Sequence, residues 1–266
     1  MANAEDEAIE ELLSGLELRF GNFTPGTMLA DLHVHTTFSD GWWEPGPLAE
    51  HAVAIGLAAV AITDHDDIRA GMVMADYCAQ RSLPLTVYAG CEVTARDGRK
   101  DVHVLGIGLA DEIRPWQSVE QTVEDIVRQG GLAVMPHPSS AKHGRPTFEQ
   151  ILALEQPVGI EIFNASAVDL QALVPDRWRT DSNQLTQHFY EKHAEHFLGA
   201  VGGTDAHFRT VGRGLTGYQG ELLDAIRNRR TTVWSRGGRE RLLPQDLVGY
   251  LKGLQRMRLR RSRRWT

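Results

Sequence analysis

Residues 28–41 read MLADLHVHTTFSDG, an apolar run that ends in two histidines and, five residues later, an aspartate. The apolar part is continuous rather than alternating, which is typical of a strand buried on both faces of a largely parallel sheet. His33 and His35 are two residues apart, so their side chains point to the same face of a strand and can bind one metal ion together. The segment therefore predicts a buried strand whose end carries a metal-binding pair.

Similar apolar runs recur along the chain and alternate with helical patterns. We predict strands at residues 28–35, 58–65, 85–94, 102–109, 131–137, 159–163 and 197–202, and helices at residues 47–55, 70–80, 119–129, 148–154, 182–196 and 221–229. Alternating strands and helices indicate an α/β fold, and about seven repeats favour a TIM-like (β/α)7 barrel over a doubly wound sheet. A chain of 266 residues is long enough for one such domain.

The ends of the chain differ from this body. We predict an acidic helical extension at residues 1–27, the barrel at residues 28–240, and a C-terminal helix with a basic tail at residues 241–266. In the extension, Ile9, Leu12, Leu13 and Leu16 have helical spacing. The glycine-rich stretches 212–220 and 235–239 are expected to be loops.

Composition excludes several classes of protein. No apolar run approaches the roughly 18 residues that a membrane span needs, and acidic residues stand where a signal peptide would be basic, so we expect a cytoplasmic protein. Cys78 and Cys91 are the only cysteines and form no CxxC pair, which argues against a disulfide framework or thiolate metal sites and predicts buried thiols. The oligomeric state stays open.

Histidines and carboxylates gather at or near the ends of the predicted strands. The motifs are DLHVH (31–35), TDHD (63–66), GCE (90–92), DVH (101–103), PHP (136–138) and TDAH (204–207). This ligand set without thiolate suits zinc, manganese or iron held for hydrolysis. Nine ligands are too many for one ion and fit two or three: His33, His35, Asp40, His65, Glu92, His103, His137, Asp205 and His207.

The successive segments DLHVHTTFSDG, ITDHD, GCE, DVHVLGIG, PHPS and GTDAH resemble the motifs of the PHP family, named for polymerase and histidinol phosphatase, over about residues 28–208. The resemblance implies a distorted seven-stranded barrel with three adjacent metal sites. It assigns His33, His35, Asp205 and a bridging Glu92 to the first ion, Glu92, His103 and His137 to the second, and Asp40, His65 and His207 to the third. Asp64 would orient a ligand through a hydrogen bond.

The resemblance also implies a metal-dependent phosphoesterase. Its nucleophile would be a water held between the first two ions with Glu92, which loses a proton near neutral pH and attacks phosphorus. We expect a small or nucleotide-like phosphorylated substrate. The candidate phosphate contacts are Arg145 first, then Lys142, Ser139, Arg209 and Asn164, with Ser140 and Arg213 as further possibilities.

Three alternatives stay open. The basic tail at residues 256–265 predicts a weak contact with nucleic acid, so one alternative is an exonuclease or oligonucleotide phosphodiesterase. A second is a hydrolase of non-phosphate esters. The third is a non-catalytic sensor of a phosphorylated ligand, which the intact ligand set disfavours.

Overall fold

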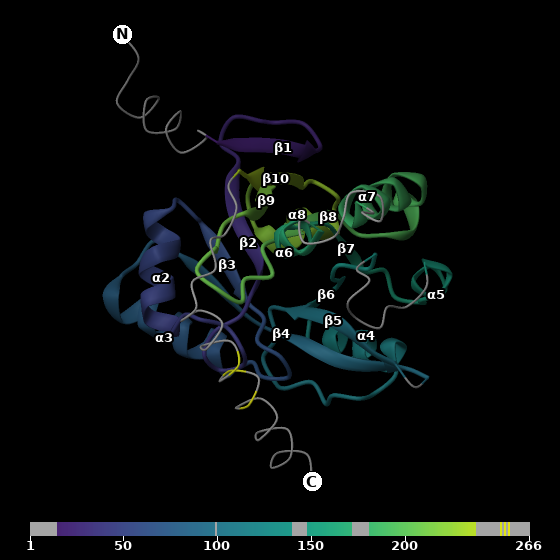
Figure 1. Ribbon diagram of the computed structural model, residues 1–266, viewed down its shortest axis with the longest axis horizontal. Helices are drawn as coiled ribbons and strands as arrows, with labels where there is room; N and C mark the ends of the chain where they lie inside the picture. The colour runs from purple at the N-terminus through teal and green to yellow at the C-terminus, as the bar shows by residue number, and fades with distance from the viewer. Residues whose placement is uncertain are drawn as a thin grey trace.

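Ten strands form one mixed sheet in the part of the chain that the structure describes (Figure 1). This computed structural model describes residues 15–98, 100–139, 148–171 and 181–237, together with Leu251, Gly253 and Gln255. The order of the strands across the sheet is β1-β10-β9-β2-β3-β4-β5-β6-β7-β8. Their bounds are β1 (Leu16–Phe20), β2 (Met28–Val34), β3 (Ala59–Ile62), β4 (Thr86–Asp97), β5 (Lys100–Ile107), β6 (Leu132–Met135), β7 (Gly159–Asn164), β8 (Ala200–Gly203), β9 (Gly214–Tyr218) and β10 (Thr232–Arg236).

The helices cover the sheet, with α2 and α3 together on one side of the view in Figure 1 and α5 and α7 on the other. Their bounds are α2 (Pro45–Ala54), α3 (Arg69–Arg81), α4 (Val119–Arg128), α5 (Phe148–Leu152), α6 (Ala165–Gln171), α7 (Ser182–Lys192) and α8 (Leu222–Arg227), with a 3-10 turn η2 (Ala194–His196). Side-chain caps fix three of the starts, because Ser118 accepts the N–H of Gln121, Asp181 accepts that of Gln184, and Glu221 accepts those of Leu223 and Asp224. The six predicted helices are present, the fifth divided into α7 and η2, whereas α6 was not predicted.

The expectation of largely parallel strands is only partly met. Four of the nine strand pairings are parallel: β2 with β3, β3 with β4, β6 with β7, and β7 with β8. Strands β4 and β5 instead form an antiparallel hairpin with Gly98 at its tip in the left-handed region, at φ +62°. Such a turn lets the chain reverse without a crossover helix. The fold is therefore mixed α/β around a curled sheet, and the regular (β/α)7 alternation is not observed.

Two further predictions are wrong, because strands form where a helix and loops were expected. Leu16–Phe20 is not helical but forms β1, which pairs antiparallel with β10. The glycine-rich stretches expected to be loops contain β9 and the end of β10. The glycines of β9 serve close packing, since a Cβ on Gly214 would overlap the carbonyl oxygen of Gly203. The predicted C-terminal helix lies outside the described residues apart from helical Leu251, Gly253 and Gln255.

The sheet curls so that the end of β2 meets the segment after β8. Backbone hydrogen bonds join Asp205 N to the carbonyl oxygen of His33 at 2.8 Å and His35 N to that of Ala206 at 3.2 Å. Buried aliphatic side chains such as Leu32, Ile62 and Ile160 belong to the core, each in a different cluster. The curl brings together the ends of strands that are remote in sequence. As expected, Cys78 and Cys91 are buried free thiols, and none of the described helices is long and apolar enough to cross a membrane.

Candidate metal centre

All nine predicted ligand residues fall in one cluster at this junction. His33 belongs to β2, Glu92 to β4 and His103 to β5. The other six follow strand ends: His35 and Asp40 after β2, His65 after β3, His137 after β6, and Asp205 and His207 after β8. The curl of the sheet thus assembles residues separated by up to 174 positions in the chain, from His33 to His207.

Glu92 lies at the centre of the cluster, buried to 1% exposure. Its Oε2 lies 3.3 Å from His33 Nε2, 3.2 Å from His35 Nε2 and 3.4 Å from His65 Nδ1. Its Oε1 lies 2.6 Å from His103 Nδ1 and 3.1 Å from His137 Nε2. One carboxylate therefore faces two separate sets of imidazole nitrogens, the arrangement expected of a group that bridges two ions.

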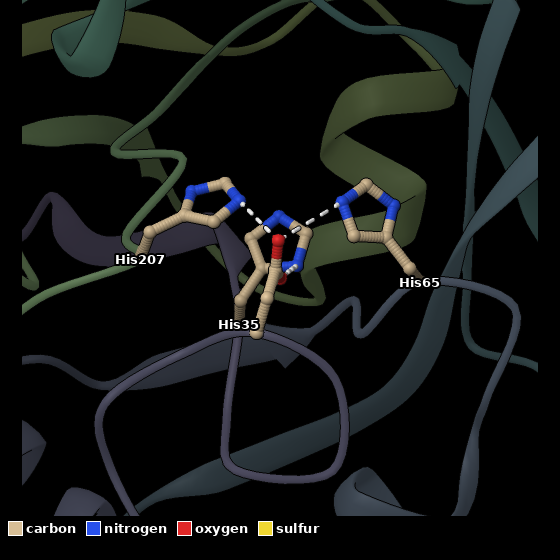
Figure 2. A group of neighbouring side chains, drawn as sticks. His35, His65 and His207 are labelled. Carbon is tan, nitrogen blue, oxygen red and sulfur yellow. Dashed lines mark ion pairs between the residues drawn. The ribbon is translucent and has the colours of Figure 1, made fainter. Parts of the chain in front are cut away.

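Two groups of atoms beside Glu92 have the spacing of a coordination shell. In one, Asp205 Oδ1 lies 3.5 Å from His33 Nε2 and 3.4 Å from His35 Nε2, on the side of Glu92 Oε2. The other contains His35, Asp40, His65 and His207, whose candidate ligand atoms lie within 4.8 Å of one another. There Asp40 Oδ2 lies 3.3 Å from His207 Nε2 and 3.8 Å from His65 Nε2. Figure 2 shows the three imidazoles of this second group directed toward one another.

The remaining ligands do not divide among three ions as clearly as the sequence-based assignment predicts. His65, Glu92 and His103 have ligand atoms within 4.8 Å of one another, so His65 can serve either of two ions. His137 lies beside Glu92 Oε1, where its backbone adopts a positive φ of 31°. A positive φ in a non-glycine residue is uncommon and is found at functional sites. The geometry thus brings the predicted residues together but leaves His35 and His65 each shared between two groups.

Several buried nitrogens fit a metal better than they fit protein partners. Within the described residues, His33 Nε2, both ring nitrogens of His35 and His65 Nδ1 make no hydrogen bond. Buried polar atoms are normally paired, so such a set requires an explanation. Ligands about 2.1 Å from one ion lie roughly 3 to 3.5 Å from one another, which matches the spacing between these nitrogens and the neighbouring carboxylates. The donor set therefore fits divalent metal ions.

Mutual electrostatics set the protonation of the metal-free cluster. Burial disfavours an imidazolium, but the carboxylates of Asp205 and Glu161 raise the pKa of His33 well above its usual value, and Asp40 and Asp205 do the same for His207. Burial likewise disfavours the ionised carboxylates, but surrounding imidazoles hold the pKa values of Glu92 and Asp205 well below their usual range. Burial lowers the pKa of His65 to about 3.

We expect metal uptake near pH 7 to release protons. His33 and His207, with raised pKa values, are protonated in the metal-free protein and must lose those protons to bind an ion, whereas Glu92 and Asp205 are already ionised. Protons from these two imidazoles, and from His35 and His137, whose pKa values are also raised, should appear in calorimetric titrations with Zn²⁺ in buffers of different ionisation enthalpy. Binding heats independent of the buffer would contradict this protonation pattern.

Two buried aspartates support the loops that carry the ligands. The carboxylate of Asp64 accepts hydrogen bonds from the N–H and hydroxyl groups of both Thr36 and Ser39, at 2.5–2.9 Å, and so holds the loop that leads to Asp40. Asp31 accepts from Thr204 N, Thr204 Oγ1 and Gly212 N, and burial raises its pKa to about 6. The sequence motifs predict a role for Asp64 but none for Asp31, although Asp31 opens the first motif.

Glu161 was also missed by sequence analysis. It is 1% exposed, and its carboxylate contacts His33 and the segment around His137. Its only signal was an acidic residue inside the apolar run GIEIFN, which is rare in a buried strand.

The predicted substrate contacts are placed unevenly. Asn164 is buried, and its amide donates to Glu161 Oε2 at 3.0 Å and to Asp205 Oδ2 at 3.4 Å, so it contacts one ligand residue of the cluster and the Glu161 carboxylate beside it. Ser139 is buried and accepts a hydrogen bond from Thr186 Oγ1 at 2.8 Å. Arg209 is exposed, and its guanidinium lies 4.4 Å from the centroid of the Trp42 ring. Arg145, Lys142 and Ser140 lie outside the described residues.

Comparison with known proteins assigns this arrangement to a family. The family described as PHP domain matches residues 31–232. An uncharacterized protein of Methanocaldococcus jannaschii is 34% identical over 149 residues, covering 52% of this chain and 82% of that protein.

Two relatives with named activities match shorter segments. The phosphoribosyl 1,2-cyclic phosphate 1,2-diphosphodiesterase of Eggerthella lenta is 41% identical over 87 residues, 32% of each chain. The 5'-3' exoribonuclease Rnm of Salmonella typhimurium is 32% identical over 82 residues, 31% of this chain and 28% of the relative. The chain thus spans about a third or less of the length of these two relatives.

A solved structure has a similar fold. It is a two-domain protein of Bacteroides vulgatus described as containing a predicted PHP-like metal-dependent phosphoesterase. The TM-score is 0.54 at 19% sequence identity, and the match covers 89% of this chain and 73% of that one.

Proposed function

The chain belongs to the PHP domain family, whose phosphoesterase members are metal-dependent hydrolases of phosphate esters, and from that premise we propose that it hydrolyses a small or nucleotide-like phosphate ester. The resemblance inferred from the motifs alone is confirmed by the family match over residues 31–232. The activity and the substrate are the parts that we propose.

The central position of Glu92 is the observation that carries this proposal. Its two oxygens lie 2.6–3.4 Å from nitrogens of five histidines, and it is almost completely buried. A carboxylate so placed can be shared between two ions about 3.5–4 Å apart, as in two-metal hydrolases. We propose two or three divalent ions per chain, of manganese, iron or zinc, because nitrogen and oxygen ligands accept all three.

We keep the three ion-holding groups that the family resemblance implies, although His35 and His65 each fall in two of the sets of neighbouring ligand atoms. We assign His33, His35, Glu92 and Asp205 to a first ion, Glu92, His103 and His137 to a second, and Asp40, His65 and His207 to a third. His65 also approaches Glu92 at 3.4 Å and can move between the last two groups. When bound, such ions supply an activated water nucleophile and neutralise the negative charge that develops on a phosphoryl group.

The protein's own side chains fix the geometry of this chemistry. Glu92 in β4 and Asp205 after β8 present carboxylates to the first group from different parts of the sheet. Because both stay ionised when metal-free, the cluster needs no uptake or loss of a carboxylate proton before it binds an ion. His207 contacts both Asp40 and Asp205, so it links the third group of ligands to the first.

A nucleotide-like substrate is supported by the relatives. The Eggerthella lenta relative is named for a phosphoribosyl cyclic phosphate. The acidic overall charge of −7 also disfavours broad binding of a polyphosphate backbone by the body of the protein. Oligonucleotide hydrolysis is the second candidate, supported by the Salmonella typhimurium relative named as an exoribonuclease and by the basic residues 256–264.

Phosphate release from a panel of phosphomonoesters, nucleotides, cyclic phosphates and short oligonucleotides tests the proposal. We expect turnover of at least one small class with metal-loaded protein and none after chelation. Asp205→Ala should remove that turnover. Preferred hydrolysis of oligonucleotides would favour the second candidate, and metal binding without turnover of any phosphate ester would shift the assignment to non-phosphate esters or to a sensor.

A further inference from the structure

Glu161 connects three parts of the metal centre through one buried carboxylate. Its Oε1 lies 3.1 Å from His33 Nδ1. Its Oε2 accepts hydrogen bonds from His137 N at 2.8 Å and from Asn164 Nδ2 at 3.0 Å. The same Asn164 nitrogen lies 3.4 Å from Asp205 Oδ2. Glu161 thus contacts two of the proposed ligand residues directly and a third through one side chain.

We propose that Glu161 is a positioning residue that fixes the tautomer and orientation of His33. A neutral imidazole carries one proton, and the nitrogen without it is the one that can bind a metal. Glu161 accepts a proton at Nδ1, so the lone pair stays on Nε2, which faces Glu92 and Asp205 at 3.3 and 3.5 Å. A carboxylate that holds a metal-binding histidine in this way also makes its other nitrogen more basic.

The geometry leaves Glu161 little choice of orientation. Its Oε2 faces two N–H donors, His137 N and Asn164 Nδ2, so Oε1 is the oxygen turned to His33. Gly203 leaves the necessary space, because a Cβ there would lie 2.5 Å from Glu161 Oε1 and 2.6 Å from His33 Cβ. The backbone of β8 at Gly203 therefore packs directly against both Glu161 and His33.

This arrangement makes Glu161→Gln an informative substitution. The glutamine has nearly the same shape, but one of its two oxygens becomes an NH2 group that can only donate. Placed at the Oε2 position, this group would face two donors, so it must turn to His33 Nδ1. It would then donate to Nδ1, so the His33 proton would move to Nε2. The nitrogen that faces Glu92 and Asp205 would then have no lone pair for a metal ion.

The inference rests on the proposed metal centre, so its test reads the ring nitrogens as well as metal content. In zinc-loaded wild-type protein, 15N NMR should show His33 protonated at Nδ1 and metal-bound at Nε2. Glu161→Gln should show a proton at Nε2 and bind its most weakly held zinc about 10 to 100 times less tightly. Wild-type His33 with the proton at Nε2 would overturn the inference even if the variant failed to fold.

Asp31→Asn is the matched control. Asp31 is also a buried carboxylate beside His33, but it accepts from backbone N–H groups and the Thr204 hydroxyl. This variant should keep the wild-type tautomer of His33. If wild-type protein takes up no zinc, the proposed metal centre fails. If it takes up zinc and Glu161→Gln leaves both tautomer and affinity unchanged, only the role of Glu161 fails.

Discussion

Replacing His33 or Glu92 by alanine is expected to lower phosphate release by at least about 10³-fold. Glu92 faces five histidines, and His33 Nε2 faces both Glu92 and Asp205, so either change breaks the group that holds the first ion. Metal ions contribute several kcal/mol of charge stabilisation, and each 1.36 kcal/mol corresponds to about a factor of ten in rate.

The measurement is turnover of the best substrate of the panel, with metal content determined on the same samples. His188→Ala is a suitable control, because His188 is an exposed histidine outside the cluster. We expect the control to keep wild-type turnover and metal content. Near-normal turnover of His33→Ala or Glu92→Ala with metal still bound would refute the assignment.

The second large effect is expected from Asp64→Ala, in stability as well as activity. The Asp64 carboxylate accepts the buried N–H and hydroxyl groups of Thr36, which lose their acceptor in the variant, whereas Ser39 N keeps the carbonyl oxygen of Thr36. A buried group left unpaired costs about 1–3 kcal/mol, so the free energy of unfolding should fall by about 2–4 kcal/mol. The loop that carries Asp40 should also lose its fixed position, and metal content should fall.

Asp64→Asn separates hydrogen bonding from charge in this prediction. Its Oδ1 can still accept from Thr36 N, Ser39 N and the Ser39 hydroxyl, and its amide can donate to the Thr36 hydroxyl, which can also accept. We therefore expect denaturant unfolding to show a much smaller loss of stability than in Asp64→Ala. Equal losses in the two variants would contradict the view that Asp64 acts by holding this loop.

The sequence was most informative where chemistry and strand pattern coincide. His33, His65 and Asp205 each lie at or just beyond the end of an apolar run, and buried strands leave their polar residues at such ends. Periodicity cannot give the direction of a strand, so the β4–β5 hairpin was read as part of a parallel repeat. Composition also did not predict β9, because Gly214 and Gly217 give that segment the composition of a loop, whereas in the structure they allow close packing of the strand.

The supports of the site were harder to predict than its ligands. Glu161 reaches His33 across 128 residues, and no local pattern predicts a contact over that separation. Asp31 stood beside the first histidine, but its role depends on Thr204 and Gly212, which only the curl of the sheet brings near. The division of ligands among ions could not be predicted for the same reason. His65 lies near two groups of ligands in space, and its position in the sequence does not show this.

The most direct test of the account is the metal content of the purified chain, measured by elemental analysis after reconstitution with manganese, iron or zinc and removal of free metal. A buried cluster of nine nitrogen- and oxygen-bearing residues around Glu92 predicts two or three ions per chain. A chain that retains no metal after reconstitution would contradict the account.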